Sequence, residues 1–218
     1  MVSKKEEEMN QQEDPWKARW NERYSDEAYA YGEEPNEYLK MQLLNLPSGS
    51  ALFPAEGEGR NAVYAAQQGW KVSAFDISEE GMKKAVKLAE RKHTEIDYRV
   101  GLLPTLNFKP ASFDLIALIY AHFPGPIKSE IHQQLITLLK PGGTIIFEAF
   151  SKRHLDYVTR NEKVGGPKDL DTLFSVEEIK NDFKNFDVVE LLETEVNLSE
   201  GSYHNGTGSV IRFVGRKK

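Results

Sequence analysis

Short apolar runs alternate with longer amphipathic segments through the middle of the chain. The apolar runs predict strands at Ala51–Phe53, Lys71–Phe75, Ile96–Val100, Ser112–Tyr120 and Thr144–Phe150. Segments with helical spacing of apolar residues lie between them, at residues 60–68, 79–93 and 126–139. This alternation with short loops favours an α/β fold with a doubly wound, mainly parallel sheet and helices on both faces.

The same spacing predicts which helix faces are buried. For the helix that Ser78 caps, these residues are Met82, Ala85, Val86 and Ala89. For the helix over 126–139 they are Ile127, Ile131, Leu135 and Leu138, and a tight turn at Lys140–Gly143 should follow it.

The pattern changes toward both ends of the chain. Ser175 should cap a helix over Val176–Phe183, and the stretches Val188–Leu198 and Ser209–Gly215 then predict a terminal antiparallel hairpin around the turn-rich segment Ser199–Gly208. At the other end, residues 1–14 read as a charge-dense, disordered tail. We expect one domain over residues 15–218, in which residues 15–47 form an N-terminal lid and helix.

An aromatic-rich segment opens this domain. Trp16, Trp20 and Tyr24 recur at helical spacing, and Asn36 should cap a second helix over residues 37–46. The aromatic side chains either pack on the main domain or form a lid that closes over a ligand together with Arg23.

Composition excludes several classes of function. The chain has 218 residues and no cysteine, so it has no disulfide, no catalytic thiolate and no cysteine-based zinc site. Its histidines are scattered without a metal-binding pair, and we expect no metal. The formal net charge of −6 argues against a nucleic-acid partner. Since no apolar run is long enough to span a membrane and no signal peptide is visible, we expect a cytoplasmic protein.

The stretch SALFPAEGEGRN, residues 50–61, joins the first strand to a helix through Gly57 and Gly59. Glycine lets a ligand approach the backbone, and the following helix offers free N–H groups. An ordinary strand-to-helix turn is the alternative. Glu56 and Glu58 flank Gly57; they would repel a pyrophosphate and attract a cationic amine or sulfonium, although Glu58 fits a solvated surface acid equally well.

Ligands of such sheets bind beyond the carboxyl ends of the strands. Asp76 ends the second strand, where a carboxylate can bind both hydroxyls of a ribose; a surface acid is the alternative. His122 follows the fourth strand and is a candidate to orient or deprotonate a substrate, against a structural role. Arg153, His154 and His204 are weaker candidates, and we expect Glu148 to be a hydrogen-bonded structural acid.

Together these residues resemble the class I S-adenosylmethionine-dependent methyltransferases. Within that superfamily the chain is similar to the small-molecule branch of tellurite-resistance and thiopurine-type enzymes, from about Trp20 to Lys217. The matching stretches are RYSDEAYAYGEEPNEYL, LFPAEGEGRNAVYAA, VSAFDIS, SFDLIALIYAHFP and LLKPGGTIIFEAF, with the terminal hairpin. The resemblance implies a Rossmann-like sheet of seven strands and S-adenosylmethionine as the cofactor.

The resemblance also assigns roles to residues. Gly57, Gly59 and Asn61 would lie at the methionine part of the cofactor, where Arg23 and Tyr31 of the lid would close over it. Asp76 would hold the ribose, while Ile77, Leu102 and Leu103 would contact the adenine. Tyr120 and His122 would border the methyl group and the substrate. The chain has Phe53, Ala55 and Gly101 where the family usually has an acid, a glycine and a second acid. Glu56 is the candidate to replace the first acid.

The predicted activity is direct methyl transfer to a small-molecule nucleophile such as a thiol or a chalcogen oxyanion. The segment Tyr120–Pro124 lacks the Asp/Asn-Pro-Pro-Tyr sequence, so we do not expect nucleobase amines as acceptors. One alternative is a non-catalytic cofactor-binding or regulatory protein. The other is an NAD-dependent oxidoreductase, although position 62 is alanine and no Tyr-x-x-x-Lys pair is recognisable. The sequence leaves the methyl acceptor and the oligomeric state open.

Overall fold

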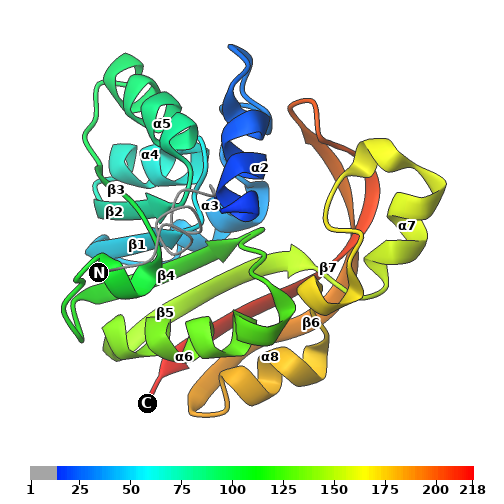
Figure 1. Ribbon diagram of the computed structural model, residues 1–218. Helices are drawn as coiled ribbons and strands as arrows, with labels where there is room; N and C mark the ends of the chain where they lie inside the picture. The colour runs from blue at the N-terminus through cyan, green and yellow to red at the C-terminus, as the bar shows by residue number, and fades with distance from the viewer. Residues whose placement is uncertain (1–13) are drawn as a thin grey trace, which may run out of the picture.

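A seven-stranded sheet forms the centre of the molecule in the computed structural model, which describes residues 14–218 (Figure 1). The strands are β1 (Ser50–Pro54), β2 (Lys71–Asp76), β3 (Asp97–Val100), β4 (Phe113–Ile119), β5 (Leu139–Phe150), β6 (Phe186–Glu200) and β7 (His204–Lys217). Their order is β3-β2-β1-β4-β5-β7-β6, and only β7 runs antiparallel to its neighbours. The predicted fold class is therefore confirmed. The predicted tail falls, apart from Asp14, outside the described residues.

Two layers of helices cover the sheet. On one face lie α3 (Glu37–Leu43), α4 (Arg60–Gln67) and α5 (Glu79–Arg91), and on the other lie α6 (Lys128–Leu138) and α8 (Val176–Asp182) (Figure 1). Successive strand residues serve opposite faces: Ile146 packs with α3 and α4, and Phe147 packs with α6 and α8. The sheet is thus buried on both sides.

Local capping explains where several helices begin. Asn36 Oδ1 accepts a hydrogen bond from Leu39 N at 2.9 Å, and Ser78 Oγ accepts one from Gly81 N at 3.0 Å. Ser175 forms a capping box with Glu178. These caps confirm the predicted starts of α3, α5 and α8.

Two predicted helix faces are partly wrong. Val86 is 37% exposed, and α5 instead buries Leu88 beside Ala85 and Ala89. Ile127 is 42% exposed because it belongs to η2 (Gly125–Ile127), a 3-10 turn before α6. The error at Val86 arises because apolar spacing does not fix how a helix is rotated against the sheet, and the error at Ile127 arises because the helix begins one residue later.

The C-terminal half contains more strand than predicted. The segment Lys140–Gly143 is a bulge within β5, where the register with β4 jumps, and not a separate turn. β6 reaches Glu200 and β7 starts at His204, so most of the turn-rich segment is strand. β7 lies between β5 and β6, and α7 (His154–Arg160), which was not predicted, packs beside it (Figure 1).

The N-terminal helix α2 (Pro15–Tyr24) lies beside α5 (Figure 1). Asn21 Oδ1 accepts hydrogen bonds from Ser78 Oγ at 2.8 Å and from Glu79 N at 3.1 Å. Ring centroids along one face of α2 lie 6.4 Å apart for Trp16 and Trp20 and 5.5 Å apart for Trp20 and Tyr24. The predicted aromatic helix is therefore confirmed. Within residues 14–218, none of the helices has the length and apolarity needed to cross a membrane.

Candidate functional site

The glycine turn after β1 has a strained, tightly packed backbone. Ala55, Gly57 and Gly59 all have positive φ, of 50°, 61° and 87°. A Cβ added to Gly59 would lie 2.5 Å from the Cβ of Ala85, so glycine here lets α5 pack against the turn. A Cβ added to Gly57 would lie 2.5 Å from the hydroxyl oxygen of Tyr24. The end of α2 therefore covers this turn directly.

Asp76 joins the glycine turn to the start of α5. Its Oδ2 accepts a hydrogen bond from Gly57 N at 3.0 Å, and its Oδ1 accepts one from Ser78 N at 2.9 Å. The side chain is buried, so the surface-acid alternative is wrong. Burial raises the pKa of Asp76 to about 6, although the backbone hydrogen bonds act against this.

Glu56 takes over the capping of α4, since the N-cap residue Gly59 has no side chain. Its Oε1 accepts hydrogen bonds from Asn61 N at 2.9 Å and from Ala62 N at 2.8 Å. Burial raises the pKa of Glu56 to about 7, against these hydrogen bonds and the positive charge of Arg60. Asn61 turns its own Oδ1 to Asn36 N at 2.9 Å and thereby ties α4 to α3.

Glu58 is not a solvated acid. It is buried, it pairs with Lys84 Nζ at 2.5 Å, and its Oε1 accepts a hydrogen bond from Ala30 N at 3.1 Å. Lys84 Nζ also donates to the carbonyl oxygens of Asp26 and Ala28. The pair therefore anchors the segment between α2 and α3 onto α5.

The two predicted lid residues lie together. Arg23 Nη1 donates to the Tyr31 hydroxyl at 3.1 Å, and the Arg23 guanidinium lies 3.8 Å from the ring centroid of Tyr203. The Tyr31 ring lies 4.5 Å from the ring of His204. The lid thus bridges from the glycine turn to the turn between β6 and β7.

The expected adenine side carries apolar surface. Leu102 is 58% exposed and Ile77 is half-buried, while Leu103 begins η1 (Leu103–Thr105) and packs partly against the core. Gly101 N donates to the carbonyl oxygen of Asp76 at 2.9 Å. These residues therefore adjoin Asp76 at the carboxyl edge of β2 and β3.

His122 does not have a free ring nitrogen. Its Nδ1 donates to the carbonyl oxygen of Thr172 at 2.9 Å, and its Nε2 accepts from Phe150 N at 3.3 Å. Burial lowers the pKa of His122 to about 3. The geometry contradicts proton transfer by His122 and favours the structural alternative.

Tyr120 ends β4 with a φ of 51°, a conformation that non-glycine residues rarely adopt. Its hydroxyl oxygen is buried and has no hydrogen-bond partner among residues 14–218. Burial raises the pKa of Tyr120 well above its usual value, and the carboxylates of Glu148 and Glu200 add to this effect. The structure thus holds a buried, unsatisfied hydroxyl at the edge where ligands of such sheets bind.

A buried ionic network lies beside this hydroxyl. Glu200 Oε2 pairs with Arg60 Nη2 at 3.0 Å and with His204 Nδ1 at 2.9 Å. Glu148 accepts from Arg212 Nε at 2.6 Å and from Asn36 Nδ2 at 2.7 Å, which confirms its prediction as a structural acid. The sequence analysis missed Arg60 and Glu200. Arg60 directly follows the glycine turn, and this position could have marked it as a candidate site residue. Glu200 could not be found in this way, because its segment was predicted to be a turn.

The network borders a cleft of about 420 Å³. Its walls come from the start of α3 and the preceding segment, from β5, β7 and the end of β6; they include Tyr31, Tyr38, Arg60, Glu148, Glu200 and Arg212. The volume falls within the usual range for small-molecule sites. Within the described part of the chain, no group of three or more potential ligand side chains is arranged to hold a metal ion.

Comparison with known proteins gives partial matches in sequence and matches in fold. Residues 54–143 match the family model of the methyltransferase domain. Ubiquinone biosynthesis O-methyltransferase of Idiomarina loihiensis is 31% identical over 99 residues, which are 44% of this chain and 40% of that protein. The enzyme of the same name from Xanthomonas campestris pv. campestris is 30% identical over 119 residues, 53% of this chain and 48% of that protein. The chain thus spans less than half the length of these curated relatives.

Solved structures share the fold at low identity. TehB from Haemophilus influenzae has a TM-score of 0.68 and 17% identity, covering 93% of this chain and 67% of that one. Magnesium protoporphyrin IX methyltransferase from Synechocystis PCC 6803, solved with bound SAH, has a TM-score of 0.63 and 17% identity, covering 84% and 83%. A structure described for the conversion of a disulfide bond into a thioacetal group during echinomycin biosynthesis has a TM-score of 0.73 and 16% identity, covering 93% and 91%.

The methyltransferase domain match divides the site into two parts. It contains the glycine turn, Asp76 and Tyr120, and it ends within the bulge of β5. The lid and the hairpin that carries Glu200 and His204 lie outside it. The matched region therefore holds the residues expected at the cofactor, while Glu200 and His204 lie in segments outside the match.

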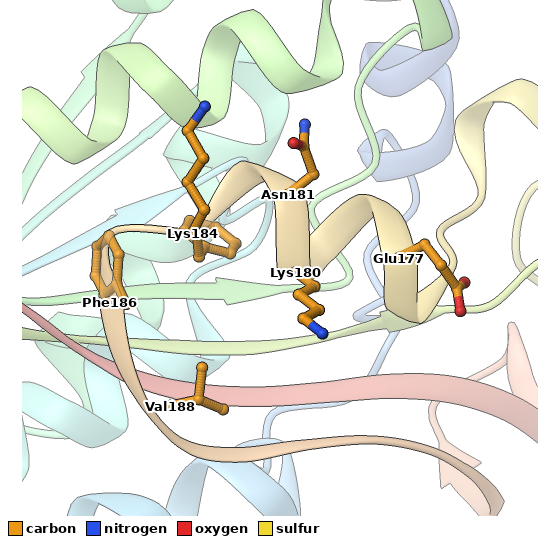
Figure 2. Close-up of a pocket in the computed structure, with 7 residues that line it drawn as sticks. Glu177, Lys180, Asn181, Lys184, Phe186 and Val188 are labelled. Carbon is orange, nitrogen blue, oxygen red and sulfur yellow. The ribbon is translucent and has the colours of Figure 1, made fainter.

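A second cavity, of about 430 Å³, lies away from this edge (Figure 2). It lies between α8 and the start of β6, where Phe186 pairs with Lys217 at the opposite end of β7 from His204. Figure 2 shows Lys180 and Lys184 pointing in different directions there. Its polar groups do not converge, so it is a weaker candidate site than the cleft.

Proposed function

We propose that this chain is an S-adenosylmethionine-dependent methyltransferase of small molecules, related to the tellurite-resistance and thiopurine-type branch. The observation that carries the proposal is the glycine turn hydrogen-bonded to Asp76, within the region that matches the methyltransferase domain. The O-methyltransferase relatives and the shared fold support it. A net charge of −6 favours a small-molecule acceptor over nucleic acid.

The residues present fit the proposed cofactor. Asp76 is a carboxylate suited to ribose hydroxyls, and the apolar side chains of Ile77, Leu102 and Leu103 suit an adenine ring. Glu56 offers a half-buried carboxyl group beside Gly57, suited to a cationic group. Arg23, Tyr31, Gly59 and Asn61 surround the same turn and would enclose the methionine end. Tyr24 covers Gly57, so the lid has to move before a ligand reaches the turn.

The bound cofactor supplies an electrophilic methyl group on a sulfonium. The chain's own residues bind, orient and exclude water. Asp76 and Glu56 place negative charge at the edge of the sheet, and α2 closes the turn from solvent. Tyr120 and the residues around it form the side from which an acceptor would approach.

Calorimetry with S-adenosylhomocysteine and with NADH tests the cofactor. We expect binding of S-adenosylhomocysteine and no binding of NADH; the reverse result would support an oxidoreductase. A methyl-transfer assay with the labelled cofactor and a panel of phenols, thiols and chalcogen oxyanions tests the activity. Binding without turnover over the whole panel would favour a non-catalytic cofactor-binding protein.

A further inference from the structure

We propose that His204 is the general base for an aromatic hydroxyl acceptor and that Glu200 is its positioning residue. This inference rests on the proposed methyltransferase function and names the acceptor class of the same site. No sequence pattern pointed to this pair, because Glu200 and His204 face each other only through the β6–β7 turn.

The hydrogen bond to Glu200 fixes the form of the His204 ring. A carboxylate only accepts, so Nδ1, 2.9 Å from Glu200 Oε2, carries the proton. In the neutral ring Nε2 then has a free lone pair, and among residues 14–218 the hydrogen bond found for this ring is the one through Nδ1. A carboxylate that orients an imidazole is the arrangement that makes histidine an effective base.

The other buried histidines differ from His204 in their bonding or their place. His132 also has a carboxylate partner, Asp182 Oδ2 at 2.8 Å from its Nδ1, but it lies away from the ligand-binding edge. Both ring nitrogens of His122 are bonded to the backbone, as described above. His154 Nε2 donates to the carbonyl oxygen of Gly165 at 2.9 Å, and its Nδ1 accepts from Ser209 N at 3.3 Å. His132 is fully buried among phenylalanines on the α6–α8 side of the sheet. Of the histidines described here, His204 alone combines a carboxylate partner with a place at the ligand-binding edge.

Aromatic rings surround His204 at that edge. Its ring centroid lies 4.5 Å from that of Tyr31, 4.7 Å from that of Tyr120 and 5.2 Å from that of Phe150. Tyr120 and Phe150 stand at the carboxyl ends of β4 and β5. His204 is buried behind the cleft, which its neighbours Tyr31 and Glu200 line. Flat aromatic walls favour a planar aromatic ligand, and the unpaired hydroxyl of Tyr120 offers it a hydrogen bond.

Charges around His204 favour the neutral ring. The titratable groups that face it are Glu200 from β6, Arg60 from α4, Arg23 from α2, His122 after β4, His154 from α7, and the side chains of Tyr31 and Tyr120. Burial lowers the pKa of His204, while Glu200 acts in the opposite direction. Although burial opposes it, the hydrogen bond from His204 and the charge of Arg60 lower the pKa of Glu200 to about 2. At neutral pH the pair is therefore a carboxylate beside a neutral imidazole.

A phenol needs such a base, because its pKa is about 10 and it is protonated at neutral pH. Nε2 of His204 takes the phenolic proton while the oxygen forms a bond to the methyl carbon. The bond between this carbon and the sulfonium sulfur breaks, and its electron pair stays on sulfur as a neutral thioether. The imidazolium that forms lies against Glu200 and later releases the proton to water.

The test compares His204→Gln with His93→Gln, a change at an exposed histidine. Rates are measured with phenols of graded acidity and with thiophenol, which ionises without help. We expect His204→Gln to lower kcat/KM for the least acidic phenol roughly 100-fold or more, and by at most a few-fold for thiophenol. His93→Gln should match the wild type. The inference would be overturned if His204→Gln lost activity equally on phenols and thiophenol, or lost none on phenols. It would also be overturned if the unmutated enzyme methylated thiols but not phenols.

Glu200→Gln provides a second readout that a purely structural role would not change. Without the carboxylate the pKa of His204 falls, so the acidic limb of kcat/KM against pH moves to lower pH and the plateau drops. If the acidic limb of the Glu200→Gln profile does not shift, the proposal is wrong. This measurement does not depend on whether His204→Gln folds. S-adenosylhomocysteine binding is measured for every variant. Its absence in the wild type would reject the proposed function, whereas its presence with unaltered pH profiles would reject only this inference.

Discussion

The hydroxyl group of Tyr24 lies directly over Gly57. A Cβ on Gly57 would lie 2.5 Å from the Tyr24 hydroxyl oxygen and 2.9 Å from the ring carbon that carries it. Tyr24 is 5% exposed and stacks on Trp20, so the last turn of α2 seals the glycine turn. The absence of a side chain at Gly57 thus makes room for the Tyr24 side chain.

Tyr24→Ala should speed up cofactor association. The ring that covers Gly57 is removed, so we expect a higher association rate for S-adenosylhomocysteine, together with a loss of stability of about 3 kcal/mol. Stopped-flow tryptophan fluorescence measures the rate, with Trp20 as a reporter next to the altered residue. Tyr24→Phe, which keeps the ring, is the matched control and should bind at the wild-type rate. An unchanged rate with weaker affinity would mean that Tyr24 holds the ligand instead of blocking it.

Gly57→Ala and Ala55→Gly test the backbone of the turn. Gly57→Ala places a side chain at a φ of 61° against the Tyr24 ring, and should destabilise the protein by about 2 kcal/mol or more. Ala55→Gly relieves a φ of 50° but loses a methyl group packed on the core, so stability should change by less than about 1 kcal/mol. Urea unfolding measures both. Equal losses would show that the positive φ of this turn is not the constraint.

The sheet was predictable because its strands are buried on both faces. Runs such as residues 112–120 are apolar almost throughout, and a short run of this kind between turn signals is typical of a central parallel strand. The caps Asn36, Ser78 and Ser175 were equally local signals. By contrast, α7 mixes polar and apolar residues in one short segment and gave no clear period. The edge strand β6 was predicted over residues 188–198, and its ends were missed.

The ionic contacts of the site were beyond local reasoning. Arg60 and Glu200 are 140 positions apart, and the charge of Glu58 said nothing of its burial against Lys84. Phe53, which stands where an acid was expected, is fully buried in the core between β1 and the α3–α4 layer. Such contacts depend on how the helices settle on the sheet, and single-sequence patterns do not contain this information.

Glu148→Ala should destabilise the protein by about 3 kcal/mol, because it removes the acceptor of the half-buried Arg212 and the shorter of the two hydrogen bonds from the buried Asn36 amide. Thermal or urea unfolding measures the loss. Glu95→Ala, at an exposed acid, should change stability by no more than about 0.5 kcal/mol. If both variants lose equally little stability, water can replace Glu148 as the partner of Arg212.

Glu56→Gln should stabilise the ligand-free protein at neutral and alkaline pH. The pKa of Glu56 is about 7 in the folded protein and about 4.5 as an unperturbed group, so the folded state binds the proton more tightly. Stability contributed by Glu56 is therefore complete below about pH 4.5 and falls as the pH rises toward 7. Glutamine keeps an acceptor for Asn61 N and Ala62 N but does not ionise.

The difference in unfolding free energy between Glu56→Gln and the wild type isolates this contribution. Asp76, with a pKa of about 6, adds a slope of the same sign to both proteins, and His122, with a pKa lowered to about 3, adds one of the opposite sign to both. We expect the difference to grow by on the order of 1–3 kcal/mol between pH 4.5 and pH 8 in urea unfolding series. A difference that stays constant with pH would show that Glu56 ionises as freely in the fold as in water. Calorimetry on the same variant then decides whether Glu56 replaces the acid missing at Phe53, since that role requires weaker S-adenosylmethionine binding by Glu56→Gln.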